Sequence, residues 1–183
     1  CVAQVAITVA GAPNIPVDAI GVSGLQTLSN WIAAWDLGGS GTAQGSMSLV
    51  GSPSYGGQAR QFVTQFMNAG DERYSVVFGD DPAVTNFVWD GWIYLTRSVS
   101  KIANLEMDMN QVMANGQTVI YGFQCDGYSG TWDYSMNAGT PESPDGRWVH
   151  TNSQCNVQNW GINRWHHVQV AYSRDDAGNV TYQ

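Results

Sequence analysis

The sequence predicts an all-β fold in which antiparallel sheets stack face to face. Three observations predict it. Short segments in which apolar and polar side chains alternate recur along most of the chain, and clusters of Gly, Asn and Asp separate them. Charged residues make up only 12% of the chain, whereas apolar residues make up 43%. Alternation with a period of two puts one face of each strand against a core, and many short strands at near-regular spacing are typical of a sandwich or jelly roll.

The first segment, residues 2–10, alternates with Val5, Ile7 and Val9 on one face. Two prolines in the following stretch end it, because each removes a backbone donor and fixes φ. A single strand is not stable unpaired. We therefore expect residues 1–12 to be the last strand of a preceding module or a strand donated to another sheet, 13–19 to be a linker, and 20–183 to be one domain.

Residues 23–36 carry apolar side chains at helical spacing and predict a short helix or turn. After residue 40 the pattern is that of strands and turns, and Asn115–Gly116 suits a tight turn because both residues tolerate positive φ. The predicted strands are 46–50, 59–67, 74–78, 86–95, 103–112, 117–125, 131–136, 147–150, 166–173 and 180–183.

The net charge of −8, with only seven Lys and Arg, excludes some partners. Nucleic acids and anionic membrane surfaces need clustered cations, so neither is expected to bind. No apolar run approaches the length needed to span a bilayer. A neutral sugar or a divalent cation fits the charge better.

The chain has three cysteines, and its low content of charged residues is common in extracellular β proteins, where disulfides form. We predict a Cys125–Cys155 disulfide that closes a loop of about 30 residues and contributes about 3 kcal/mol; two free buried thiols are the alternative. Disulfides are typical of secreted and cell-surface proteins. Cys1 is then left over, either to pair outside this chain or to be the acylated first residue of a lipoprotein.

Residues 165–172, with the sequence Trp-His-His-Val-Gln-Val-Ala-Tyr, resemble the Trp-His-x-Val-x-Val-x-Tyr strand of laminin-G-like, concanavalin A-like jelly rolls. Residues 104–109 and 118–134 are also similar to the form of this domain in secreted bacterial proteins. The resemblance implies a two-sheet antiparallel jelly roll over residues 20–183, preceded by the tail of an immunoglobulin-like module. It also implies a jelly roll that is incomplete at its C-terminal end. An open sheet edge pairs with further strands, so exchange of the 2–10 segment between neighbours would build an oligomer or fibre.

Residues 106–111 resemble the Glu-x-Asp-x-x-Glu strand of retaining glucanases on this fold. The resemblance places Glu106 at the nucleophile position and Asp108 at the helper position. The acid/base position holds Asn110 or Gln111, and neither amide delivers a proton at neutral pH. The strand therefore favours a binding surface, with a polar strand face in contact with water or residual catalysis by Glu106 and Asp108 as alternatives.

Polysaccharide lyases on this architecture need a cation and a Tyr or His base. Arg147, His150, Tyr128 and Tyr134 offer such groups, but the characteristic lyase strands are missing from the sequence. His166 and His167 are neighbours in a predicted strand, so they point to opposite faces and do not chelate one metal.

Aromatic side chains are the other candidates for sugar binding, because their faces stack on the apolar face of a pyranose. Trp132 and Trp148 lie between the paired cysteines and are the first choices, with Tyr134 beside them. The remaining indole candidates are Trp89, Trp92 and Trp160.

No cofactor is indicated with certainty, and calcium is the ion that the acidic turns would suit. The candidates are Asp71, Glu72, Asp80 and Asp81 in one region and Asp126 and Asp133 in another, although their spacing matches no known loop signature.

Together these patterns predict a secreted or cell-surface module that binds a polysaccharide or glycan, or mediates adhesion, without catalysis. A polysaccharide-cleaving enzyme and a self-assembling fibre subunit are the alternatives.

Overall fold

The computed structural model describes residues 15, 17–35, 40–79, 81–97, 99–140 and 142–183. These residues form antiparallel sheets and two short 3₁₀ helices, so the all-β prediction is confirmed. The strands are distributed over four small sheets, where the sequence predicts two. The predicted strand at residues 2–10 lies outside the described residues. No helix among the described residues is long and apolar enough to cross a membrane.

The chain divides into two compact units: the first is formed by residues 18–79, and the second contains the described residues from 81 to 183. The first unit contains η1 (Leu25–Thr27) and two sheets of two strands each. One sheet pairs β1 (Ile32–Trp35) with β4 (Glu72–Ser75), and the other pairs β2 (Thr42–Val50) with β3 (Ala59–Met67).

The helical spacing of residues 23–36 produces only the single turn of η1, and the rest of that segment becomes β1. Gly24 has a φ of 73° at the start of η1, and the indole N–H of Trp31 donates to the carbonyl of Leu25 at 2.8 Å. Ile32–Trp35 then pairs with β4. A distant strand thus supplies the backbone hydrogen bonds that a longer helix would have made locally, and the sequence pattern does not reveal such a partner.

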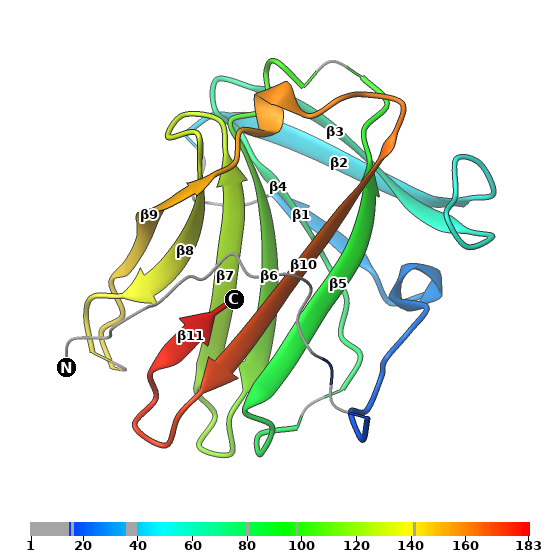
Figure 1. The fold of residues 1–183 in the computed structure, drawn as a ribbon. Coiled ribbons are helices and arrows are strands. Elements are labelled where there is room, and N and C mark those ends of the chain that lie inside the picture. The colour runs from blue at the N-terminus through cyan, green and yellow to red at the C-terminus, as the bar shows by residue number, and fades with distance from the viewer. Residues whose placement is uncertain (1–14, 16, 36–39, 80, 98, 141) are drawn as a thin grey trace. The chain divides into compact units, whose positions relative to one another are not determined.

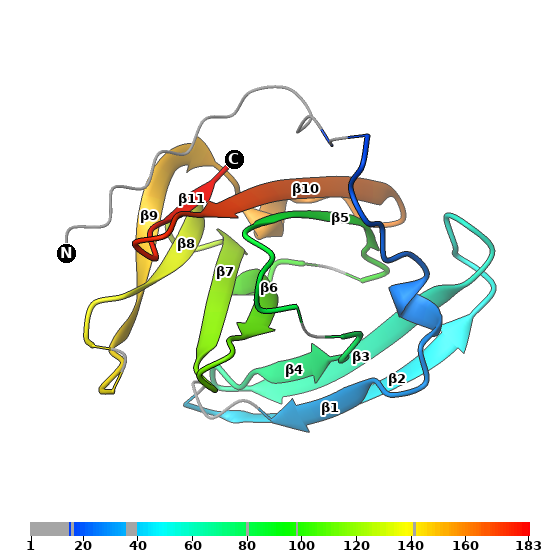
Figure 2. The same cartoon turned by 90° about the horizontal axis from the view of Figure 1, so that it is seen from below.

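The second unit contains two larger sheets (Figures 1 and 2). The three-stranded sheet has the order β11 (Val180–Tyr182), β10 (Trp165–Arg174), β5 (Asn86–Tyr94). The four-stranded sheet runs β6 (Asn104–Val112), β7 (Thr118–Asp126), β8 (Thr131–Asn137), β9 (Gly146–Gln154). The short helix η2 (Val157–Asn159) lies between β9 and β10. Every strand predicted after residue 40 overlaps an observed strand.

The two sheets of this unit share one hydrophobic core. Met107, Tyr121 and Phe123 enter it from the four-stranded sheet, and Tyr172 and Tyr182 enter it from the three-stranded sheet. These residues follow the period-two alternation that the sequence shows, because alternate side chains of a strand share a face. The even-numbered residues of β6 therefore face away from the core, as the burial of this strand confirms.

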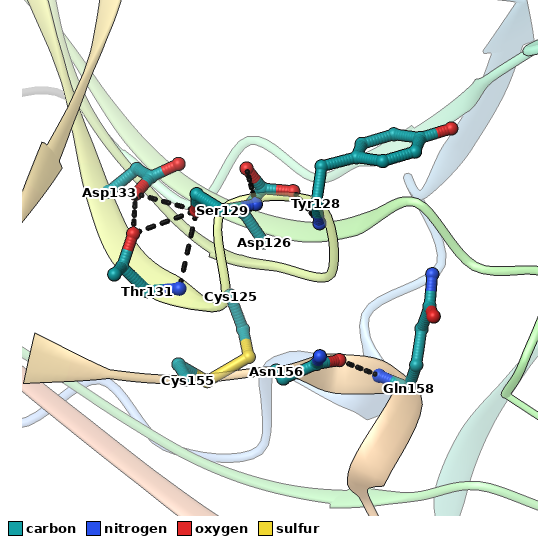
Figure 3. The surroundings of a disulfide bond; sticks show 9 residues. All are labelled: Cys125, Asp126, Tyr128, Ser129, Thr131, Asp133, Cys155, Asn156 and Gln158. Atoms are coloured by element: carbon teal, nitrogen blue, oxygen red, sulfur yellow. Dashed lines mark hydrogen bonds between the residues drawn. A yellow bond between two sulfur atoms is a disulfide. The ribbon is translucent and has the colours of Figure 1, made fainter.

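The predicted disulfide is present: Cys125, at the end of β7, is bonded to Cys155, just after β9, and their Cα atoms are 5.3 Å apart (Figure 3). Both cysteines are buried with Val157 in a second hydrophobic cluster. The bond fixes the segment after β9 to the end of the central strand β7. Cys1 lies outside the described residues.

Candidate functional site

The four-stranded sheet brings polar residues from four strands together on its side away from the core. The strand register pairs Glu106 with Gln124, Gln124 with Asp133, and Asp133 with His150, so these residues form one row across the sheet. We call this side the polar face. It carries Glu106, Asp108 and Asn110 on β6, Gly122 and Gln124 on β7, Asp133 and Ser135 on β8, and Trp148 and His150 on β9.

Exposure differs between the outer and the central strands of the polar face. Glu106 and Asp108 on β6, and Trp148 and His150 on β9, are exposed. Gln124 on β7 and Asp133 on β8 are 4% and 1% exposed. Side chains on both borders can therefore contact a ligand, while the centre of the face is a closed hydrogen-bonded layer.

Asp133 is the centre of that layer. Its Oδ1 accepts hydrogen bonds from the hydroxyls of Thr131 at 2.7 Å and Ser129 at 3.4 Å. Its Oδ2 accepts from Nε2 of Gln124 at 3.2 Å and lies 3.0 Å from Nδ1 of His150. These donors compensate the burial of the carboxylate, which would otherwise be costly.

The row continues to β6 through Asn104, whose Nδ2 donates a hydrogen bond to the side-chain oxygen Oε1 of Gln124. At the other end His150 is held through Nδ1, and 63% of its side chain is exposed. Its Nε2 is therefore the imidazole nitrogen available to a ligand.

Asp126 lies beside this network at the turn after β7. Its carboxylate accepts backbone hydrogen bonds from Tyr128 at 2.8 Å and Ser129 at 3.2 Å (Figure 3). Burial raises the pKa of Asp126, but the hydrogen bonds from the backbone of Tyr128 and from the backbone and hydroxyl of Ser129 outweigh it and hold the pKa below its ordinary value. Asp126 is therefore a carboxylate that fixes the turn.

Asp126, Asp133 and His150 each offer one ligand atom, and these atoms lie within 4.8 Å of one another. A divalent cation would find three protein ligands here, fewer than the six to eight oxygens that calcium takes. It would also have to displace hydrogen bonds that both carboxylates already accept. Calcium at Asp126 and Asp133 thus stays a prediction.

The other calcium candidates are not part of this cluster. Asp81 lies in an exposed turn, where its carboxylate accepts from the backbone of Ala83. Asp80 lies outside the described residues. Asp71 and Glu72 belong to the unit of residues 18–79, in which Glu72 begins β4.

Gly122 allows Asp108 and Ser135 to approach each other on the polar face. A Cβ atom at position 122 would lie 2.6 Å from Oγ of Ser135 and 3.1 Å from Oδ1 of Asp108. Pairing between β7 and β8 extends only from Phe123 to Cys125 on β7, so at Gly122 the ladder has ended. Only glycine leaves the space that these two side chains fill.

Tyr182 reaches the same point. Its hydroxyl hydrogen-bonds with the Ser135 side chain and accepts from the backbone N–H of Gly122. Burial, and to a smaller extent the charge of Asp108, raise the pKa of Tyr182 far above its ordinary value. The phenol therefore stays neutral, and its hydrogen bonds connect β11 to β7 and β8 at the point where these two strands stop pairing.

The structure separates the predicted binding residues into two groups. Glu106, Asp108, Asn110 and Trp148 share the polar face. Trp132 and Tyr134 alternate with Asp133 on β8 and so point to the core side. There Trp132 packs against Phe123 and Trp160, and Tyr134 packs against Tyr182.

The residues considered for a lyase do not converge either. Arg147 precedes Trp148 on β9 and binds the carboxylate of Asp145 at 2.7 Å. Tyr128 is 81% exposed in the turn after β7.

The two adjacent histidines have different partners. His166 stacks on Trp160, whereas His167 stacks on Trp92 and binds Asp90. Of the two remaining indole candidates, Trp89 packs edge-on against Phe123, and Trp92 is 40% exposed on the other sheet.

The pairing of Asp133 with His150 is the feature of the face that sequence reasoning missed, although it considered each residue separately. The alternation in 131–137 places Asp133 on the other face of the strand from Trp132 and Tyr134. This pattern would have predicted that Asp133 points away from the core. The partner of Asp133 depends on the register between β8 and β9, which contains an irregularity between Thr131 and Asp133.

Comparison of the chain with models of protein families, with curated proteins and with solved structures finds no match. The geometry of the site is therefore what bears on function.

Proposed function

We propose that this chain is an extracellular module that binds a neutral glycan on the polar face without cleaving it, and that its domain is a jelly roll of the concanavalin A-like kind. One observation carries the proposal. An exposed indole, Trp148, and two exposed carboxylates, Glu106 and Asp108, occupy opposite borders of a single sheet face whose centre is polar and buried.

The dimensions support an oligosaccharide. Neighbouring strands lie about 4.8 Å apart, so β6 and β9 are separated by roughly 14 Å across the sheet. A short sugar chain lying across the strands would stack on Trp148 at one end. Its hydroxyls would donate to Glu106 and Asp108 at the other end, and Nε2 of His150 would accept a further hydroxyl.

The charge of the face supports a neutral ligand. Glu106 and Asp108 would repel uronates or sulfated sugars, and the whole chain has a net charge of −8. Asn110 occupies the next outward position on β6, where a third acid would be needed for retaining hydrolysis. An amide there supports binding without turnover. The Cys125–Cys155 disulfide supports an extracellular location.

A glycan array probed with the whole chain tests this function. We expect binding to neutral oligosaccharides with no release of reducing ends and no rise in absorbance at 235 nm. Trp148→Ala is expected to weaken binding by about tenfold or more, as loss of one stacked ring would. Trp92→Ala is the matched control, since Trp92 is exposed to a similar degree on the three-stranded sheet.

Three outcomes would contradict the proposal. If Trp92→Ala and Trp148→Ala weaken binding equally, or if no neutral glycan binds, the polar face is not the site. Product release that disappears in Glu106→Gln would instead identify a polysaccharide-cleaving enzyme.

A further inference from the structure

The second unit contains a hollow of about 620 Å³ that is separate from the polar face. Its walls come from the turn before β8, the segment from the end of β9 through η2, and the start of β10. The lining residues are Gly130, Trp132, Gln154, Cys155, Asn156, Asn159, Trp160, His166, His167 and Val168. We call it the indole pocket. Its volume is within the range of about 300–1,000 Å³ that is usual for small-molecule sites.

Aromatic rings form the apolar part of the indole pocket. Trp132 and Trp160 meet edge to face, with ring centroids 6.5 Å apart. His166 stacks on Trp160 at 4.9 Å, and its Nε2 lies 2.7 Å from the carbonyl oxygen of Gly161. That bond fixes the imidazole ring and leaves Nδ1 for another partner.

Amide side chains form the polar part. Asn156 uses its side-chain oxygen to cap η2 through the backbone N–H of Gln158 at 2.9 Å, which leaves both hydrogens of its Nδ2. Among the described residues, none hydrogen-bonds to the side chains of Gln154 and Asn159. Each of these amides can donate and accept at once, as the hydroxyls of a sugar require.

No Asp, Glu, Lys or Arg is among the residues that line the pocket. A charged ligand would therefore find no ionic partner among these lining side chains. An uncharged ligand with an apolar ring face and several hydroxyls could stack on the aromatic rings and hydrogen-bond with the amide side chains.

The frame of the pocket is fixed by bonds that do not involve a ligand. The Cys125–Cys155 disulfide holds one wall (Figure 3). The backbone N–H of Cys155 donates to the Gly130 carbonyl at 3.0 Å. The N–H of Trp160 donates to the carbonyl of Val157 at 3.0 Å. A preformed site loses little entropy on binding.

From these observations we infer that the indole pocket is a binding site for an uncharged mono- or disaccharide, independent of the polar face. Trp160 and Trp132 supply the stacking surface, and Gln154, Asn156 and Asn159 supply the hydrogen bonds. The module would then hold two sugar units at separate places on one chain.

The probes are cellobiose, maltose, lactose and N,N′-diacetylchitobiose, with digalacturonic acid as the charged comparison. Titration of the whole chain is followed through the indole N–H resonances, assigned by single Trp substitutions. We expect at least one neutral disaccharide to shift the resonances of Trp132 and Trp160, and digalacturonic acid to shift neither.

Asn159→Ala and Gln154→Ala remove exposed side chains and so preserve the fold. Each is expected to lower the affinity for the disaccharide that shifts the Trp132 and Trp160 resonances by about threefold to tenfold, as loss of one neutral hydrogen bond would. Trp148→Ala is expected to leave this affinity unchanged. Since Trp160 packs on the core, Trp160→Ala is interpreted only where its circular dichroism spectrum matches that of the wild type.

The inference is overturned if none of the four neutral disaccharides moves the Trp132 and Trp160 resonances, or if digalacturonic acid moves them more strongly. It is also overturned if Trp148→Ala abolishes those shifts. Failure of glycan binding at the polar face, by contrast, would appear as an unaltered Trp148 resonance and leaves this result unaffected.

Discussion

Nδ1 of His150 lies 3.0 Å from Oδ2 of Asp133, and the two side chains join an exposed outer strand to a buried central one. The carboxylate is 1% exposed, whereas most of the imidazole is open to solvent. Asp133 thus stabilises the sheet and at the same time aims His150 at the surface.

Replacing Asp133 tests the structural role. In Asp133→Asn, an amide N–H₂ faces donors from Thr131, Ser129, Gln124 and His150, so at least one buried donor loses its acceptor. We expect the free energy of unfolding to fall by about 2–3 kcal/mol in urea denaturation. Asp145→Asn is the control. It breaks an exposed ion pair with Arg147 and is expected to cost less than about 1 kcal/mol. Equal losses in the two variants would contradict the central role of Asp133.

Two buried tyrosines of the core provide a matched pair. The hydroxyl of Tyr182 bonds with Ser135 and Gly122, whereas among the described residues none bonds the hydroxyl of Tyr172. Tyr182→Phe is therefore expected to lower the free energy of unfolding by about 1–2 kcal/mol. Tyr172→Phe is expected to be neutral or stabilising, because it removes a buried polar atom without a partner. Chemical denaturation of both variants measures the difference, and a larger loss in Tyr172→Phe would refute the assignment.

Because of the Cys125–Cys155 disulfide, we expect the stability of the protein to depend on whether these cysteines are oxidised or reduced. Cross-linking Cys125 to Cys155 closes a loop with a sequence separation of 30 residues. Its removal in the Cys125→Ser, Cys155→Ser double variant is expected to cost about 3–4 kcal/mol. Thermal unfolding with and without dithiothreitol should show the same loss in the wild type and no change in the variant. A wild-type midpoint that does not respond to complete reduction, confirmed by thiol titration, would count against this contribution.

Acid is expected to destabilise the turn after β7. Because the pKa of Asp126 in the folded state is below its unfolded value, its contribution to stability is present above about pH 4, the ordinary pKa of an Asp. That contribution is lost as the pH falls through the lower, folded value. Urea denaturation from pH 7 to pH 2 should therefore show a smaller acid-induced loss in Asp126→Asn than in the wild type. Parallel stability curves for the two proteins would show that this carboxylate is not responsible.

The positions of the strands of the second unit were predictable because each strand buries one face and leaves the other in water. In β6 this alternation places Glu106 and Asp108 outward and Met107 inward, as the burial shows. The disulfide was predictable because Cys125 and Cys155 were the two cysteines within one loop-rich stretch. The strand β1 was not, since its partner β4 lies far along the chain and its own pattern resembles a helix.

The sequence by itself determined the all-β class and the strand segments after residue 40, since these follow from local alternation. Only the tertiary structure decided which outward residues became neighbours. The register between strands places Glu106, Gln124, Asp133 and His150 in one row, and the loop after β9 brings Trp160 against Trp132. Register and loop path depend on the packing of residues distant in the chain, and local patterns carry no record of that packing.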